Sequence, residues 1–284
     1  MTAVRMDGKE LAARVREGVA RAVAELGHVG LATVLVGDDP ASHVYIAAKH
    51  KAATEAGIDA RDVRLPVDAT QDEVLELVDR LNNDAEVDGI LVQLPLPSPI
   101  DETKVTYAVA PAKDVDGFHP VNAGNLYLGT PIHVPATPSG CMELLRAYEI
   151  DPAGKEAVVI GRSEIVGRPM AMLLMHANAT VTVCHSRTAD LAAHVRRADI
   201  VVAAVGRPGI VTAEMVKPGA ACLDVGLTRT EEGIRGDIDA SVAAVAGFLT
   251  PMPGGTGPMT IAMLLQSTVK AARYRRGLLA FPGA

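Results

Sequence analysis

Short apolar runs alternate with longer segments of helical periodicity along most of the chain. Apolar runs bounded by glycine, proline or polar residues are typical of buried strands. They cover residues 31–36, 89–94, 157–160, 180–184, 200–205 and 220–225. Apolar positions three and four apart predict helices over residues 8–26, 40–56, 71–83, 139–148, 167–176, 188–197 and 259–275. This alternation predicts parallel sheets with helices on their faces.

Proline-rich segments divide this pattern into two parts. Prolines between Pro95 and Pro111 break the chain into loop, and residues 135–138 precede a second series of strands and helices. We therefore expect an α/β fold with two domains, an N-terminal catalytic domain and a Rossmann-like domain. Their expected bounds are residues 1–137, completed by the C-terminal helix 256–284, and residues 138–255. A cleft between two such domains is a common place for a ligand.

Composition narrows the class of protein. The chain has 284 residues, 49% of them apolar, and a net charge of −7, which argues against a broad nucleic-acid interface. It has neither an N-terminal apolar run nor a stretch of the roughly 18 apolar residues that a membrane helix needs, so we expect a cytoplasmic protein. Cys141, Cys184 and Cys222 are far apart, which fits buried thiols in a reducing compartment. We expect no metal site, because no CxxC or His-x-x-x-His pairing occurs.

The segment from Val158 to Gly167 reads as a strand, a tight turn and the start of a helix. Gly161 permits a positive φ in the turn, and Gly167 lets the helix and strand approach closely. The helix N-terminus offers free N–H groups to a pyrophosphate. Ser163 stands where the second glycine of a GxGxxG pattern would be, so a glycine turn in a domain without a ligand is the alternative.

The end of the following strand favours NADP over NAD. NAD enzymes place an acid about 20 residues after the first glycine, where it binds the ribose 2′-hydroxyl. Here Ser186 and Arg187 occupy that place and no carboxylate does. A 2′-phosphate needs positive charge and hydrogen-bond donors. We expect Arg162, Ser186 and Arg187 to bind it, although Arg187 is also consistent with a solvated surface charge.

Tyr45 and Lys49 lie four residues apart and share one face of a predicted helix. Most residues around them are alanine, so Lys49 is expected to lose solvation and its pKa to fall toward neutral pH. The alternative is an ordinary surface lysine.

Three further segments carry candidate ligand groups. Gln93 lies at the carboxyl end of a predicted strand, where parallel α/β sheets place such groups. Asp114 and Asp116 lie in a turn, either as functional acids or as turn caps. The glycine-rich segment from Pro253 to Thr260 either brings bare backbone close to a flat ligand or acts as a hinge.

Together these segments resemble the bifunctional methylenetetrahydrofolate dehydrogenase/cyclohydrolase family. The matching pieces occur in the family's order and cover nearly the whole chain. They are Pro40 to Ser42 with Tyr45 and Lys49, then Val92 to Pro97, Lys113 to Gly117, Gly161 to Ser163 with Val166 to Pro169, and Pro251 to Thr260. The departures are small: Leu227 stands where isoleucine is common, and Thr256 where valine often occurs.

The resemblance implies a role for each matching residue. Lys49 would be the central catalytic group, tuned by Gln93. Tyr45, Leu94 and Asp116 would bind folate, with Asp116 on the amino-pyrimidine edge of the pterin. Folate and nicotinamide contacts would come from Pro253, Gly254, Gly257 and Pro258, and NADP contacts from Gly161, Arg162, Ser163, Ser186, Arg187 and Leu227. A homodimer is also implied.

The implied reactions are oxidation of 5,10-methylenetetrahydrofolate with NADP, then hydrolysis of the 5,10-methenyl product to 10-formyltetrahydrofolate. Two rivals are another two-domain NADP dehydrogenase, of the shikimate or amino-acid type, and a binding protein that keeps the fold without turnover. The set Tyr45, Lys49, Gln93 and Asp116 favours the folate enzyme over both.

Overall fold

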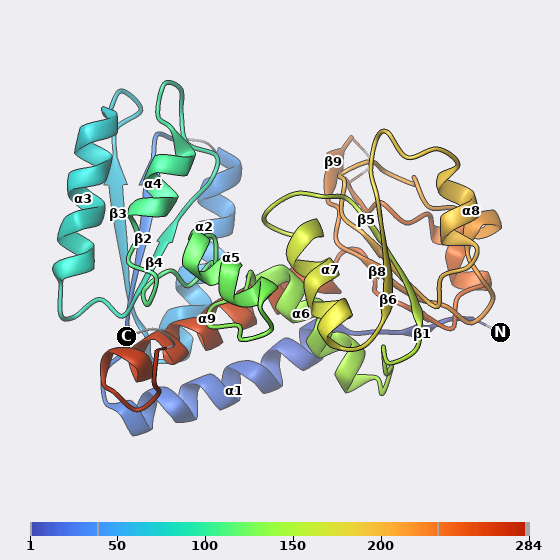
Figure 1. The fold of residues 1–284 in the computed structure, drawn as a ribbon. Coiled ribbons are helices and arrows are strands. Elements are labelled where there is room, and N and C mark those ends of the chain that lie inside the picture. The colour runs from blue at the N-terminus through green and yellow to red at the C-terminus, as the bar shows by residue number, and fades with distance from the viewer. Residues whose placement is uncertain (1, 39, 232, 282–284) are drawn as a thin grey trace. The chain divides into compact units, whose positions relative to one another are not determined.

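The chain folds into two compact units, described from a computed structural model (Figure 1). The structure describes residues 2–38, 40–231 and 233–281, without the side chains of residues 40–45. Unit 1 takes the described residues of Met1–Ala13 and Thr137–Thr260, and unit 2 those of Arg14–Ala136 and Ile261–Ala284. From Ile261 on, the C-terminal helix belongs to the unit that contains residues 14–136. The first residues group with unit 1, whereas the sequence pattern places them in the first domain.

Unit 1 is built on a parallel sheet whose described strands follow the order β1-β11-β8-β7-β5-β6. The strands are β1 (Val4–Arg5), β5 (Glu156–Ile160), β6 (Thr180–Cys184), β7 (Ile200–Ala203), β8 (Ala221–Asp224) and β11 (Phe248–Leu249). Residue Ile160 of β5 pairs with Cys184 on one side and Ala203 on the other. The strand order therefore reverses at β5, and the carboxyl ends of these strands share one edge, where open α/β sheets bind ligands.

Helices α6 (Ala136–Ala147), α7 (Gly167–His176) and α8 (Leu191–Val195) and the 3₁₀ turns η1 (Ala213–Met215) and η2 (Ala240–Ala244) connect these strands. A hairpin of β9 (Thr228–Thr230) and β10 (Gly233–Arg235) follows β8. The predicted helix over residues 188–197 is wrong at both ends. Asp190 adopts a left-handed conformation (φ 47°) and caps the helix by accepting from Ala193 N, so the helix begins only at Leu191.

Unit 2 contains a parallel sheet in the order β3-β2-β4, from β2 (Gly30–Val36), β3 (Asp59–Leu65) and β4 (Gly89–Val92). Its helices are α1 (Gly8–Leu26), α2 (Pro40–Glu55), α3 (Gln71–Asn83), α4 (Glu102–Ala108), α5 (Pro120–Tyr127) and α9 (Thr256–Arg275), of which α1 and α9 each have their first residues in unit 1. Apolar residues of β2, β4, α3 and α4 pack into one core. The expectation of loop between Pro95 and Pro111 is wrong, because Asp101 caps α4 by accepting from Thr103 N and Lys104 N.

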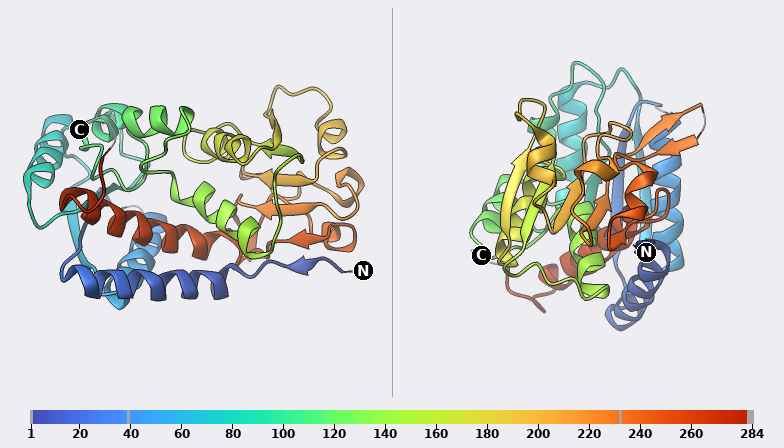
Figure 2. Two further views of the ribbon diagram at one scale, coloured as in Figure 1. Left: turned by 60° about the horizontal axis from the view of Figure 1, so that its bottom comes forward. Right: turned by 90° about the vertical axis from the view of Figure 1, so that its right-hand side faces the viewer.

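Helices α1 and α9 lie side by side (Figure 2). The guanidinium of Arg276, just after α9, donates to the carbonyls of Leu26 and His28 at the end of α1. These bonds fix the C-terminal segment of unit 2. Among the described helices, none combines the length and the apolar character needed to cross a bilayer.

Candidate active site

Lys49 is a buried lysine on α2, with 9% of its surface exposed. Its Nζ donates to Oε1 of Gln93 over 3.2 Å. The Gln93 amide is oriented by its Nε2, which donates to the carbonyl of Leu94 over 2.7 Å, so that its oxygen faces the lysine. Gln93 N donates to Val34 O, which anchors the end of β4 to β2. The surface-lysine alternative is therefore wrong.

Burial shifts the ionisation of Lys49 and Asp116 in opposite directions. It lowers the pKa of Lys49 below its usual value, against the attraction of the Asp116 carboxylate. Burial also raises the pKa of Asp116 to about 7, opposed by the charge of Lys49 and reinforced by Asp114. A carboxyl group with a pKa near 7 beside a lysine whose pKa is lowered suits acid–base chemistry near neutral pH.

The turn after Lys113 separates the roles of its two acids. Asp114 Oδ1 accepts from Gly117 N, and its Oδ2 accepts from His119 N and from Nδ2 of Asn122. The turn-capping interpretation is thus correct for Asp114. Asp116 takes no part in these bonds. A side chain at Gly117 (φ 71°) would collide with the backbone of residues 133–135, so the turn requires glycine there.

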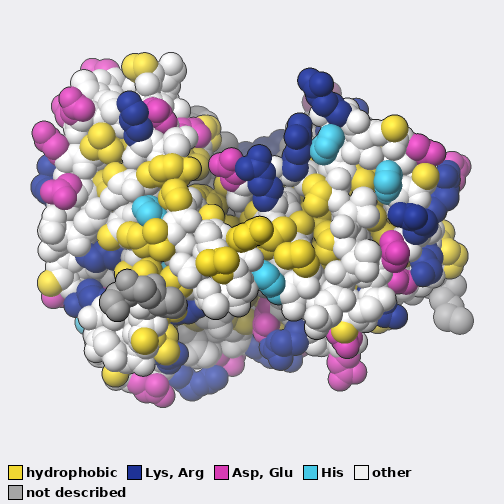
Figure 3. Space-filling view, in the orientation of Figure 1, with side chains coloured by type: hydrophobic (Ala, Val, Ile, Leu, Met, Phe, Trp, Pro, Cys, Tyr) yellow, Lys and Arg dark blue, Asp and Glu magenta, His cyan; other side chains and the backbone are white. Residues whose placement is uncertain are grey.

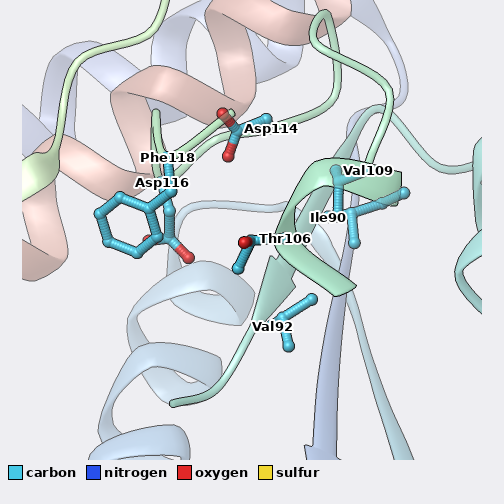
Figure 4. A pocket seen from close by; sticks show the side chains of 7 residues that line it. All are labelled: Ile90, Val92, Thr106, Val109, Asp114, Asp116 and Phe118. Carbon is cyan, nitrogen blue, oxygen red and sulfur yellow. The ribbon is translucent and has the colours of Figure 1, made fainter. Parts of the chain in front are cut away.

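Asp116 lines a pocket in unit 2 together with residues of β4, α4 and the same turn (Figure 4). The pocket is small and partly open to solvent. Its other lining residues are Ile90, Val92, Thr106, Val109, Asp114 and Phe118. Asp116 thus lies among largely apolar neighbours with the Asp114 carboxylate close by, and both raise its pKa.

The remaining predicted residues of α2 are only partly described. Position 45 lies one turn before Lys49 in the helix, as the spacing predicts. The side chains of Ser42 and Tyr45 lie outside the described residues.

In unit 1, the turn after β5 is as tight as the glycine pattern predicts. A Cβ on Gly161 (φ 123°) would lie 2.5 Å from Ala204 O, and one on Gly167 would lie 2.3 Å from Gly161 O. Ser163 Oγ accepts from Val166 N and Gly167 N at the start of α7. Close backbone approach at a helix N-terminus fits a pyrophosphate.

Arg162, Ser186 and Arg187 are exposed on neighbouring loops of unit 1. Gly161 N donates to Cys184 O over 2.8 Å, so the loops that follow β5 and β6 start next to each other. The second loop is ordered by its own bonds, in which His185 N donates to Thr188 Oγ1 and Arg187 N to His185 Nδ1. Figure 3 shows Lys and Arg side chains gathered at the upper rim of unit 1, although the chain is acidic. This donor set fits a 2′-phosphate.

The other predicted ligand residues of unit 1 follow β8 and β11 at the same sheet edge. Leu227 comes after β8 with 46% of its surface exposed. The turn before α9 is tied to this edge, because Thr256 Oγ1 donates to Asp224 O over 2.9 Å. That turn also bonds to α1 through Gly8 N and Gly254 O. It contains Pro253 and Gly254, whereas Gly257 and Pro258 lie in the first turn of α9.

Several buried polar residues near these positions escaped the sequence analysis. In unit 1 they are Asp224 and Asp237, and in unit 2 Asn122 and His133. Asp224 interrupts the apolar run of residues 220–225, and Asp237 follows a glycine. Those two signals were available in the sequence, whereas Asn122 and His133 carry no comparable one.

Comparison with known proteins identifies the family to which this chain is similar. Residues 6–116 match the family described as tetrahydrofolate dehydrogenase/cyclohydrolase, catalytic domain, and residues 135–276 match its NAD(P)-binding domain. The chain is 56% identical over 279 residues to the bifunctional protein FolD of Moorella thermoacetica, covering 96% of this chain and 100% of the relative.

Two solved structures have the same fold over nearly their full length. The crystal structure of the bifunctional enzyme FolD from Campylobacter jejuni gives a TM-score of 0.95 at 47% identity, covering 96% of this chain and 99% of that one. The Trypanosoma brucei dehydrogenase-cyclohydrolase, complexed with NADP cofactor and inhibitor, gives 0.92 at 40% identity, covering 99% and 100%.

Proposed function

The chain belongs to the tetrahydrofolate dehydrogenase/cyclohydrolase family, and on that premise we propose that Lys49, held by Gln93 and beside Asp116, is its central catalytic group. The protein is a methylenetetrahydrofolate dehydrogenase and a methenyltetrahydrofolate cyclohydrolase. It oxidises 5,10-methylenetetrahydrofolate with NADP and hydrolyses the 5,10-methenyl product to 10-formyltetrahydrofolate.

The burial of Lys49 against Gln93 is the observation that carries this assignment. An uncharged amine donates one N–H to Gln93 Oε1 and keeps a lone pair for another proton. Water that attacks the methenyl carbon must lose a proton, and Lys49 accepts it as general base. The positive charge of the methenyl substrate lowers the pKa of Lys49 further, because two adjacent cations repel.

Asp116 binds the amino-pyrimidine edge of the pterin. A carboxylate accepts two parallel N–H bonds, and such donors favour the ionised form of an acid. The raised pKa of Asp116, about 7 without substrate, is therefore expected to fall when folate binds. Leu94 and Tyr45 complete the proposed folate contacts.

The carboxyl edge of the unit 1 sheet binds the dinucleotide. Backbone at Gly161 and Ser163 approaches the pyrophosphate, and Arg162, Ser186 and Arg187 bind the 2′-phosphate. When bound, NADP supplies the acceptor for the hydride of the methylene carbon. Leu227, with Pro253, Gly254, Gly257 and Pro258, completes the nicotinamide and folate contacts. We assign catalysis to residues 1–137 with the C-terminal helix 256–284, and NADP binding to residues 138–255.

Substitution Lys49→Met tests this function. The variant keeps an apolar chain of similar length but has no amine, so it should lose hydrolysis of methenyltetrahydrofolate. Binding of NADP, measured by titration calorimetry, should match the wild type. Unchanged hydrolysis by Lys49→Met would overturn the assignment.

We also propose a homodimer in the cytoplasm. Family membership supports the dimer, and the three buried free thiols of Cys141, Cys184 and Cys222 fit a reducing compartment. Light scattering of the purified chain should give twice the mass of 29.6 kDa, and a monomeric mass would reject the dimer.

A further inference from the structure

A buried carboxylate holds the loop that follows β7 in unit 1. Asp237 is fully buried, and its Oδ2 accepts from Val205 N over 2.6 Å and from Gly206 N over 3.1 Å. Its Oδ1 accepts from Arg207 N over 2.6 Å. Consecutive backbone N–H groups of this kind form a concave anion site. Here the chain fills that site with one of its own side chains.

A second buried carboxylate fixes the position of Asp237. Asp224, 2% exposed at the end of β8, accepts from Asp237 N over 2.9 Å and from Ile238 N over 3.1 Å. Glycines make room for both acids. A Cβ on Gly236 would lie 1.8 Å from Asp224 Oδ2, and one on Gly226 would lie 2.0 Å from Asp237 Cγ. The strand end of β8 is thus connected through two acids to the loop after β7.

The Val205–Arg207 loop lies beside the point where the strand order reverses. Ala204 N donates to Ile160 O over 2.8 Å at the end of β5. A Cβ on Gly161 would lie 2.5 Å from Ala204 O and 3.4 Å from Val205 Cγ1. The loop is therefore one wall of the glycine turn to which the proposed function assigns the pyrophosphate.

We infer that Asp237 is a positioning residue for NADP, which it serves by holding the Val205–Arg207 loop against the Gly161 turn. The inference rests on the proposed function, because it needs NADP at this edge of unit 1. Since Asp237 already satisfies the three N–H groups of the loop, the nucleotide phosphates are left to the Gly161–Ser163 turn and α7. Asp237 itself does not touch the cofactor.

The nearly isosteric substitution Asp237→Asn is the main test. Its amide nitrogen cannot accept a hydrogen bond, so at least one of the three N–H groups loses its partner. Titration calorimetry should show NADP binding weakened by about tenfold or more. Hydrolysis of methenyltetrahydrofolate without NADP should stay within about twofold of wild type, because we place that reaction at Lys49 in unit 2.

Two further variants make the test specific. Asp239→Asn is the matched control, since Asp239 caps η2 by accepting from Ser241 N and asparagine can do the same. It should leave NADP binding unchanged. Gly206→Ala strains the backbone of the same loop, because Gly206 has φ 64°. No described atom lies within 4 Å of the added Cβ, so the substitution introduces no clash. It should weaken NADP binding by about three- to fivefold.

The outcomes separate this inference from the proposed function. Wild-type NADP affinity in both Asp237→Asn and Gly206→Ala, with a lowered melting temperature, would show a purely structural role and overturn the inference. If Asp237→Asn cannot be purified, Gly206→Ala decides alone: weaker NADP binding with normal hydrolysis supports the inference, and unchanged binding rejects it. Failure of the proposed function looks different, because the wild-type chain would then neither bind NADP nor hydrolyse methenyltetrahydrofolate.

Discussion

The Lys49 site of unit 2 and the sheet edge of unit 1 are built in opposite ways. Around Lys49, ionisable side chains are buried, so their pKa values shift toward neutral pH. At the edge of unit 1, the proposed ligand side chains Arg162, Ser186 and Arg187 are exposed, and the tight packing is between backbone atoms at Gly161 and Gly167. Proton transfer requires perturbed groups, whereas phosphate binding requires donors and close backbone approach. Substitutions in the two regions should therefore have separable effects.

The largest effect is expected from Lys49→Arg. Arginine is similarly long but, unlike a neutral lysine, stays protonated at any working pH, so it cannot act as a base. Methenyltetrahydrofolate hydrolysis, followed by absorbance, should fall by about 10²–10⁴-fold. NADP affinity should not change. A variant that retained a tenth of the wild-type rate would show that a charged group suffices at this position.

Gly161→Ala should act on the other region. The new Cβ would lie 2.5 Å from Ala204 O at a φ of 123°, so the turn must move. NADP binding, measured by calorimetry, should weaken by about 100-fold, while hydrolysis at Lys49 persists. The matched control is Gly154→Ala, which also has a positive φ (72°) but meets no described atom within 4 Å. Equal loss of NADP binding in both variants would mean that strain alone is responsible.

A smaller effect is expected from replacing Arg162 and Arg187 together with alanine. Both side chains are exposed and were assigned to the 2′-phosphate, which NAD lacks. The KM for NADP in the dehydrogenase assay should rise by about tenfold, with a change below about twofold for NAD. Equal changes for the two cofactors would remove the charge argument for NADP.

The last effect concerns the free energy of unfolding rather than ligand binding or activity. Burial raises the pKa of Asp116 from 3.8 to about 7, so its ionisation costs free energy in the folded state as pH rises through that window. The Asp116→Asn variant has no ionisable group at this position. Urea unfolding should show the variant gaining about 4 kcal/mol over wild type between pH 4 and pH 8. A constant difference across this range would contradict the raised pKa.

Elements with a clear apolar period were predictable, and those that depend on distant contacts were not. The predicted helix over 167–176 is confirmed at both ends, because glycine starts it and its apolar face is regular. Strand β3 was missed, since Asp59–Leu65 alternates charged residues and forms an edge of its sheet. Helix α4 was missed because the prolines around it suggested loop.

The candidate site shows the same limit. Helical spacing placed positions 45 and 49 on one face, but it could not show that Lys49 is buried. In the folded protein Lys49 is buried against Gln93, which is 44 positions away in the sequence. The division of roles between Asp114 and Asp116 likewise depends on Asn122 and His119, whose bonds with Asp114 form only in the folded turn.

The central claim is that Lys49 is an uncharged amine in the working enzyme, and NMR of protein labelled with ¹³C at the lysine ε-carbon tests it directly. The Lys49 signal is identified by its absence in Lys49→Met. We expect this signal to have the chemical shift of a neutral amine at the pH of the activity assay, because burial lowers the pKa of Lys49. The chemical shift of a protonated ammonium at that pH would contradict the claim.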